Sequence, residues 1–130
     1  MESERKVLLL VEDEFILQVQ LVEPLEEAGF AVLTETKGAT AIETYQQKAS
    51  EICALITDVT LADATTGWEV AHKARELNSH LPVIYTTSYT SETWAANGVP
   101  NSVHVMKPFV AVQVITALAQ LLNSGADPGP

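Results

Sequence analysis

Cysteine and positive charge are both scarce in this sequence. Cys53 is the only cysteine among 130 residues, which excludes an internal disulfide and suits a reducing cytoplasm. Seven Lys and Arg oppose seventeen Asp and Glu, giving a formal net charge of −10. Because that field repels phosphate backbones, we expect no direct nucleic-acid binding. The negative charge favours binding of a divalent cation or of a basic protein partner. Alternatively, the acidic residues serve only to keep the protein soluble.

Long apolar runs are also absent. The longest, at 7–11, is too short to cross a bilayer, and the acidic start of the chain lacks the features of a signal peptide. We therefore expect no membrane insertion and a cytoplasmic location. A length of 130 residues, with 47% apolar and 18% charged residues, indicates one compact domain.

What the sequence does contain is a regular alternation of short apolar runs and helical periodicity. The predicted strands cover residues 7–11, 30–33, 52–57, 82–87 and 103–106. The predicted helices cover residues 14–28, 38–45, 68–77, 91–97 and 110–122, with Gly29 ending the first. Because parallel strands need crossover helices, this order predicts a three-layer, doubly wound α/β domain with a five-stranded parallel sheet. The core is expected at about 6–122, and the small polar tail at 123–130 is expected to be disordered.

Polar side chains stand where the predicted strands end. Glu12 and Asp13 follow the first strand, Asp58 the third and Lys107 the fifth, while Thr87 closes the fourth. In open parallel sheets such ends meet at one functional edge. Clustered carboxylates are costly unless a cation joins them, and hard oxygen ligands suit Mg²⁺. A carboxylate beside such a metal can attack a phosphoryl group, so we predict that Asp58 accepts phosphate, with the lysine and threonine contacting it.

These motifs, in this order, resemble the receiver domain of two-component response regulators over about residues 6–122. The resemblance implies a flavodoxin-like fold with strand order 2-1-3-4-5. It implies that Asp58 is the phosphoacceptor, Thr87 the switch hydroxyl and Lys107 the phosphate-contacting lysine. The bond from Lys107 to Pro108 is cis in the family.

The resemblance also implies a ligand set for Mg²⁺. Asp13, Asp58 and the backbone carbonyl of Thr60 would bind the ion, and Glu12 would act directly or through water. Glu14, by contrast, is interpreted as a first-turn residue favoured by the helix dipole.

Two places depart from the family pattern. The loop from Asp58 to Gly67 is one residue longer than usual, and Ala62 stands where a proline is customary. His104 occupies the position of the aromatic switch residue, three before the lysine; its alternation with apolar neighbours predicts a half-buried, hydrogen-bonded histidine. Tyr89 is a nearby aromatic to which no role is assigned.

We therefore predict a stand-alone response regulator receiver. A histidine kinase or a phosphotransfer protein would phosphorylate Asp58 with Mg²⁺, and an unknown downstream protein would bind in a phosphorylation-dependent way. Trp94, on a short helix near the switch hydroxyl, is expected either to be buried or to belong to a partner surface. The receiver would assist its own phosphorylation and dephosphorylation without turning over a separate substrate, so it is not classed as an enzyme.

Two alternatives remain open. A pseudo-receiver binding module would keep the fold and work without phosphorylation, which the longer loop and His104 permit. A Mg²⁺-dependent aspartyl-phosphate phosphatase is less consistent with the sequence, because such enzymes place a second carboxylate two residues after the nucleophile, where Thr60 stands here.

Overall fold

The predicted alternation of strands and helices is present in the computed structural model, which describes residues 5–88 and 91–126. The strands are β1 (Lys6–Val11), β2 (Phe30–Glu35), β3 (Ile52–Asp58), β4 (Val83–Thr87) and β5 (Val103–Met106). The helices are α1 (Phe15–Glu27), α2 (Gly38–Lys48), α3 (Gly67–Leu77), α4 (Ser91–Asn97) and α5 (Ala111–Ala126). Gly29, with φ of 104°, follows the end of α1, as its position in the sequence predicted.

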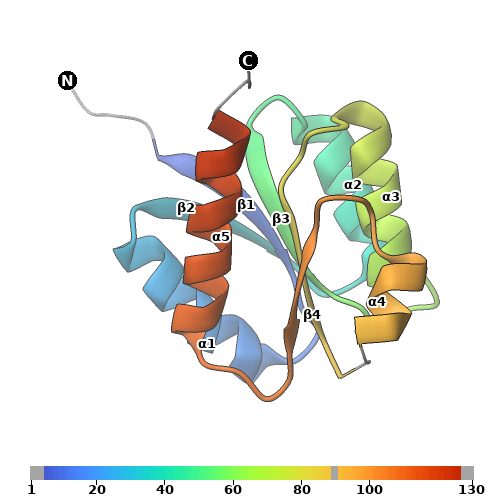
Figure 1. The fold of residues 1–130 in the computed structure, drawn as a ribbon, viewed down its shortest axis with the longest axis horizontal. Helices are drawn as coiled ribbons and strands as arrows, with labels where there is room; N and C mark the ends of the chain where they lie inside the picture. Colours follow the sequence, from blue (N-terminus) through green and yellow to red (C-terminus); the bar gives the residue numbers. More distant parts are fainter. Residues whose placement is uncertain (1–4, 89–90, 127–130) are drawn as a thin grey trace.

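All five strands are parallel and form one sheet in the order β2-β1-β3-β4-β5, which confirms the predicted topology. The chain builds outward from β1 to β2, then returns to place β3 on the other side of β1. That reversal between β1 and β3 is the point where ligands bind in folds of this kind. In Figure 1, α1 and α5 cover one face of the sheet and α2 and α3 the other.

The core consists of two layers, one on each face of the sheet. Successive side chains of a strand point to opposite faces, so Leu9 and Val11 of β1 pack with the α2 and α3 side. Leu8 and Leu10 pack with α1 and α5. A strand buried on both faces explains why β1 is an uninterrupted apolar run.

Helix α5 differs from the prediction at its carboxyl end. It continues to Ala126, four residues beyond the predicted end of the helix at 122. A helix that has already formed extends at small cost through polar residues, and one glycine costs only about 1 kcal/mol relative to alanine. Residues 127–130 lie outside the described part of the chain. No helix in the described ranges is long and apolar enough to cross a membrane.

Candidate functional site

The carboxyl ends of the strands lie together at the bottom of the view in Figure 1. A cavity of about 470 Å³ opens there. Its lining residues come from the ends of β1, β3, β4 and β5 and the segments that follow them: Asp13, Glu14, Asp58, Thr60, Ser88 and Lys107. The cavity therefore contains four of the residues that the sequence assigned to a site, together with two that it did not.

Asp58 is the last residue of β3 and is 5% exposed. Its position depends on Gly67 at the start of α3, which packs directly against the end of the strand. A Cβ built on Gly67 would meet the carbonyl oxygen of Asp58 and would lie 2.9 Å from the Cα of Val59. The Gly67 N–H donates to the Val59 carbonyl at 2.8 Å. The glycine thus allows α3 to begin immediately beside the candidate acceptor.

Glu12 is almost completely buried, although it is a carboxylate. Its Oε2 accepts a hydrogen bond from the Glu14 N–H at 3.1 Å, while Oε1 has no hydrogen-bond partner among the described residues. Burial raises the pKa of Glu12 to about 7; the Glu14 N–H opposes this shift and the nearby charge of Asp58 adds to it. A buried oxygen without a hydrogen bond, beside other carboxylates, is suited to a cation.

Carboxylate oxygens of Glu12, Asp13 and Asp58 lie within 4.8 Å of one another. Asp13 is exposed, and the other two are buried. The donors are all hard oxygens, which a small divalent cation prefers. The predicted acidic cluster is therefore assembled in space, and its residues fit a metal ion.

Lys107 supplies the positive charge at this edge of the sheet. Its Nζ donates to Asp58 Oδ2 at 2.8 Å and lies 3.8 Å from both Glu12 Oε1 and Glu14 Oε1. Partial burial acts to lower the pKa of Lys107, but the hydrogen bond and charge of Asp58 and the two glutamates raise it overall. The peptide bond to Pro108 is cis, as the resemblance implied.

Glu14 was not assigned to the site from the sequence. It precedes α1 at the N-cap position without capping the helix with its side chain. The carboxylate lines the cavity and approaches Lys107 instead. An acidic residue before a helix is common for dipole reasons alone, so nothing in the pattern distinguished it. Ser88 also lines the cavity and was not assigned to the site, because it is one of several hydroxyl residues at the end of β4.

Residues 8–119 match the family model of the response regulator receiver domain. The chain belongs to this family. The response regulator receiver protein CpdR of Brucella abortus is 28% identical over 119 residues, which cover 90% of this chain and 97% of CpdR. The transcriptional regulatory protein CreB of Escherichia coli is 29% identical, but the chain spans only 52% of it. This receiver is thus a domain of two-component signalling, and longer regulators contain a similar domain as one part.

Solved structures agree with this assignment. The crystal structure of a response regulator receiver protein from Sinorhizobium medicae is 39% identical and superposes with a TM-score of 0.89. The match covers 94% of this chain and 98% of that one. The chemotaxis protein CheY4 of Vibrio cholerae, at 23% identity and a TM-score of 0.80, shares the fold.

Thr87, the predicted switch hydroxyl of this receiver, is buried at the end of β4. Its carbonyl accepts the N–H of Lys107 at 2.8 Å, and it pairs in register with Met106 of β5. Ser88, the next residue, lines the cavity. The backbone of β4 therefore connects the cavity directly to β5.

His104 is half-buried, as predicted, and its ring stacks on Trp94 of α4 with centroids 4.5 Å apart and planes tilted by 30°. The indole N–H of Trp94 donates to the hydroxyl of Ser102 at 2.9 Å, and that hydroxyl donates to the Val99 carbonyl. Trp94 is thus half-buried and held against β5. In this receiver a His–Trp stack occupies the place of the usual switch aromatic, and Tyr89 lies outside the described residues.

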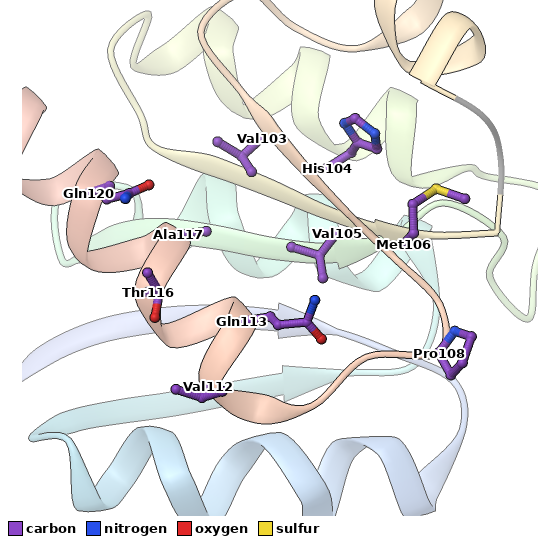
Figure 2. Close-up of a pocket in the computed structure, with 10 residues that line it drawn as sticks. All are labelled: Val103, His104, Val105, Met106, Pro108, Val112, Gln113, Thr116, Ala117 and Gln120. Carbon is purple, nitrogen blue, oxygen red and sulfur yellow. The ribbon is translucent and has the colours of Figure 1, made fainter.

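A second cavity, a groove of about 600 Å³, lies between β5 and α5. Figure 2 shows Val103 and Val105 pointing toward the helix, and His104 and Met106 pointing to the opposite side of the strand. The residues that line the groove carry apolar, amide, hydroxyl and imidazole side chains and include no Asp, Glu, Lys or Arg: Val103, His104, Val105, Met106, Pro108, Val112, Gln113, Thr116, Ala117 and Gln120. Such a groove suits contact with a protein rather than with a small charged ligand.

Proposed function

We propose that this receiver accepts a phosphoryl group on Asp58 from a histidine kinase or a phosphotransfer protein. The observation that carries the proposal is the 2.8 Å contact between Lys107 Nζ and Asp58 Oδ2, inside a cluster of three carboxylates at the end of β3. An ammonium group that donates a hydrogen bond to a carboxylate fixes its orientation, which favours its attack as a nucleophile. The adjoining acidic residues are in a position to share a cation with the incoming phosphate.

The transfer exchanges one bond for another. A carboxylate oxygen of Asp58 attacks the phosphorus, a P–O bond forms, and the P–N bond to the donor imidazole breaks, so that the imidazole leaves with its proton. When Mg²⁺ is bound by Asp13, Asp58 and the Thr60 carbonyl, with Glu12 ligating directly or through water, it supplies positive charge to the phosphoryl oxygens. Lys107 supplies a second charge, and the Thr87 hydroxyl hydrogen-bonds the phosphoryl group once it is on Asp58.

We propose that the receiver does not turn over a separate substrate. Phosphatases that use an aspartyl phosphate place a carboxylic acid two residues after the nucleophile as a proton donor. Thr60 occupies that position here, and its side chain has no acidic proton to transfer. The receiver would then catalyse only steps that occur at its own Asp58.

The surface beside the cavity supports a protein as the phosphoryl donor. Phe15 and Ile16, at the start of α1, are 75% and 69% exposed. They directly follow Glu14, which lines the cavity and whose carboxylate lies 3.8 Å from Lys107 Nζ. Apolar side chains in such a place favour a macromolecular partner that covers them during transfer. The groove between β5 and α5 is the surface we assign to the downstream protein.

We also propose that the receiver works as a stand-alone signalling protein in the cytoplasm. CpdR consists of little more than the matched region, since the match covers 97% of it, and the match also covers 98% of the crystallised Sinorhizobium medicae chain. The single cysteine is compatible with a reducing compartment.

Labelling with acetyl phosphate and Mg²⁺ tests the phosphoacceptor directly. The expected product gains one phosphoryl group that is stable to acid and labile to hydroxylamine, and Asp58→Asn should give none. A wild-type protein that binds Mg²⁺ without being labelled, or equal labelling of the variant, would reject the proposal. The first of these results would favour a pseudo-receiver that works without phosphorylation.

A further inference from the structure

The loop between β3 and α3 is hydrogen-bonded to α2, a helix in which no functional residue was predicted. Asp63, within the loop between β3 and α3, accepts two backbone hydrogen bonds from the start of α2. Its Oδ1 accepts the Gly38 N–H at 2.8 Å and its Oδ2 the Ala39 N–H at 3.0 Å. Lys37, the N-cap residue of α2, makes no side-chain cap. Asp63 therefore supplies from a distant part of the chain the cap that α2 lacks locally.

The geometry around this cap is close. A Cβ on Gly38 would lie 2.6 Å from the Thr65 carbonyl oxygen and 2.7 Å from the Thr65 Cγ2. Leu61, earlier in the same loop, is buried in the core layer that also contains Ala41 of α2. The loop thus lies against the first turn of α2 at several points, and the two hydrogen bonds of Asp63 are its polar attachment. The Ala39 and Gly38 N–H groups lower the pKa of Asp63, so the carboxylate remains ionised at neutral pH.

The other end of the loop reaches the acceptor site. Thr60 lines the cavity together with Asp13 and Asp58, three positions before Asp63 in the chain. A backbone carbonyl can bind a cation only if its peptide plane is held in one orientation, and a loop outside regular structure needs attachments to hold it. Leu61 and Asp63 are the nearest attachments that follow Thr60.

We propose that Asp63 is a positioning residue that holds the loop carrying Thr60 against α2, so that cation binding at the acceptor site is coupled to the first turn of α2. This inference rests on the proposed function for the cation ligands. The coupling must act in both directions. If the cap favours the loop geometry that binds the cation, cation binding must in turn strengthen the two hydrogen bonds at Gly38 and Ala39.

The first test is Mg²⁺ affinity, measured by titration of the intrinsic tryptophan fluorescence of the full chain. Loss of an outer attachment of a metal ligand commonly costs about tenfold or more in affinity, and we expect Asp63→Ala to lose about that much. Asp63→Asn retains one acceptor oxygen and should recover part of the loss. Thr66→Ala is the matched control, because it removes the cap of α3 at the end of the same loop without touching α2. Its Mg²⁺ affinity should stay close to that of the wild type.

The second test uses the wild-type protein and does not depend on a variant that folds. Amide hydrogen exchange at Gly38 and Ala39 should slow on addition of Mg²⁺, and by more than at Glu69, whose N–H is bonded to Thr66 on the α3 side. Equal Mg²⁺ affinity of Asp63→Ala and wild type, or no selective slowing at Gly38 and Ala39, overturns the inference, as does a wild type that does not bind Mg²⁺. Labelling of Asp58 by acetyl phosphate reports separately on the proposed function, so the two can fail independently.

Discussion

Lys107 and Asp58 lie 49 residues apart in the chain, and their side chains meet at 2.8 Å. The contact joins the end of β5 to the end of β3, two strands that are separated in the sheet by β4. Because β4 lies between the two strands, the side chains can meet only beyond the carboxyl edge of the sheet, where β4 has also ended. Both side chains line the cavity, and the ammonium group of Lys107 holds the carboxylate of Asp58 in place.

Replacing Lys107 with methionine should affect both labelling and stability. The variant leaves Asp58 and the buried Glu12 without their nearby cation, and removing one partner of a buried ion pair leaves the other charge uncompensated. We expect the free energy of unfolding to fall by about 2 kcal/mol in urea titrations without metal. The rate of labelling by acetyl phosphate should fall about a hundredfold, because a charge on the phosphoryl oxygens is lost. Addition of Mg²⁺ should restore more stability to the variant than to the wild type.

Divalent cations should stabilise the folded receiver through the acidic cluster. An ion that binds only the folded state stabilises it by about 2.7 kcal/mol at a concentration one hundred times its Kd. Thermal unfolding should therefore shift upward as Mg²⁺ is added, and Asp13→Ala should suppress the shift. Glu43→Gln removes an exposed carboxylate of α2 and serves as the control for nonspecific charge effects. A shift of equal size in Asp13→Ala would place the ion elsewhere.

Gly67 offers a test of how tightly the acceptor strand is supported. Alanine at this position would drive its Cβ into the Asp58 carbonyl oxygen, so the strand end or the start of α3 must move. We expect a loss of about 2 to 3 kcal/mol in the free energy of unfolding, typical of overpacking, together with slower labelling of Asp58.

Gly29→Ala is the comparison for this prediction. Gly29 has φ of 104° but open space around its Cβ position, so its cost is backbone strain of about 1 kcal/mol. Gly29→Ala should label at the wild-type rate. If Gly67→Ala did the same, the packing of α3 would have no part in positioning the acceptor.

The residues of the candidate site that the sequence predicted are those whose positions follow from the alternation of elements. Glu12, Asp13, Asp58 and Lys107 each follow a strand that is recognisable from its apolar run, and the topology of a parallel sheet brings strand ends together. The positions of these four needed only the order of elements, whereas Thr60, which also lines the cavity, was assigned through the family resemblance. The strand order itself came from the family resemblance, since periodicity alone does not select one doubly wound order over another.

The remaining features depend on side-chain directions that no local pattern encodes. Glu14 turns toward Lys107 although its sequence position is that of an ordinary first-turn acid. Asp63 lies in an irregular loop, and its two donors belong to a helix 24 and 25 residues away. The stack of Trp94 on His104 joins α4 to β5, and each aromatic alone is compatible with several arrangements. Contacts of this kind arise from tertiary packing.

The apolar start of α1 gives a prediction that separates the chemistry of the receiver from its recognition. Phe15 and Ile16 are exposed beside the cavity but do not belong to it. Replacing both with serine should leave labelling by acetyl phosphate unchanged, because that donor needs only the cavity. Transfer from a phosphorylated histidine kinase or phosphotransfer domain that labels the wild type should become slower, by about tenfold or more if the pair contributes as interface hot spots do.

The control for this variant is Leu77→Ser, which changes another apolar and exposed residue, at the far end of α3. Leu77→Ser should support wild-type rates with both donors. The effect must therefore be specific both to the position of the residues and to the kind of donor. If the α1 variant lost both reactions equally, its defect would lie in folding or in the cavity; if it lost neither, the donor protein would approach Asp58 from another side.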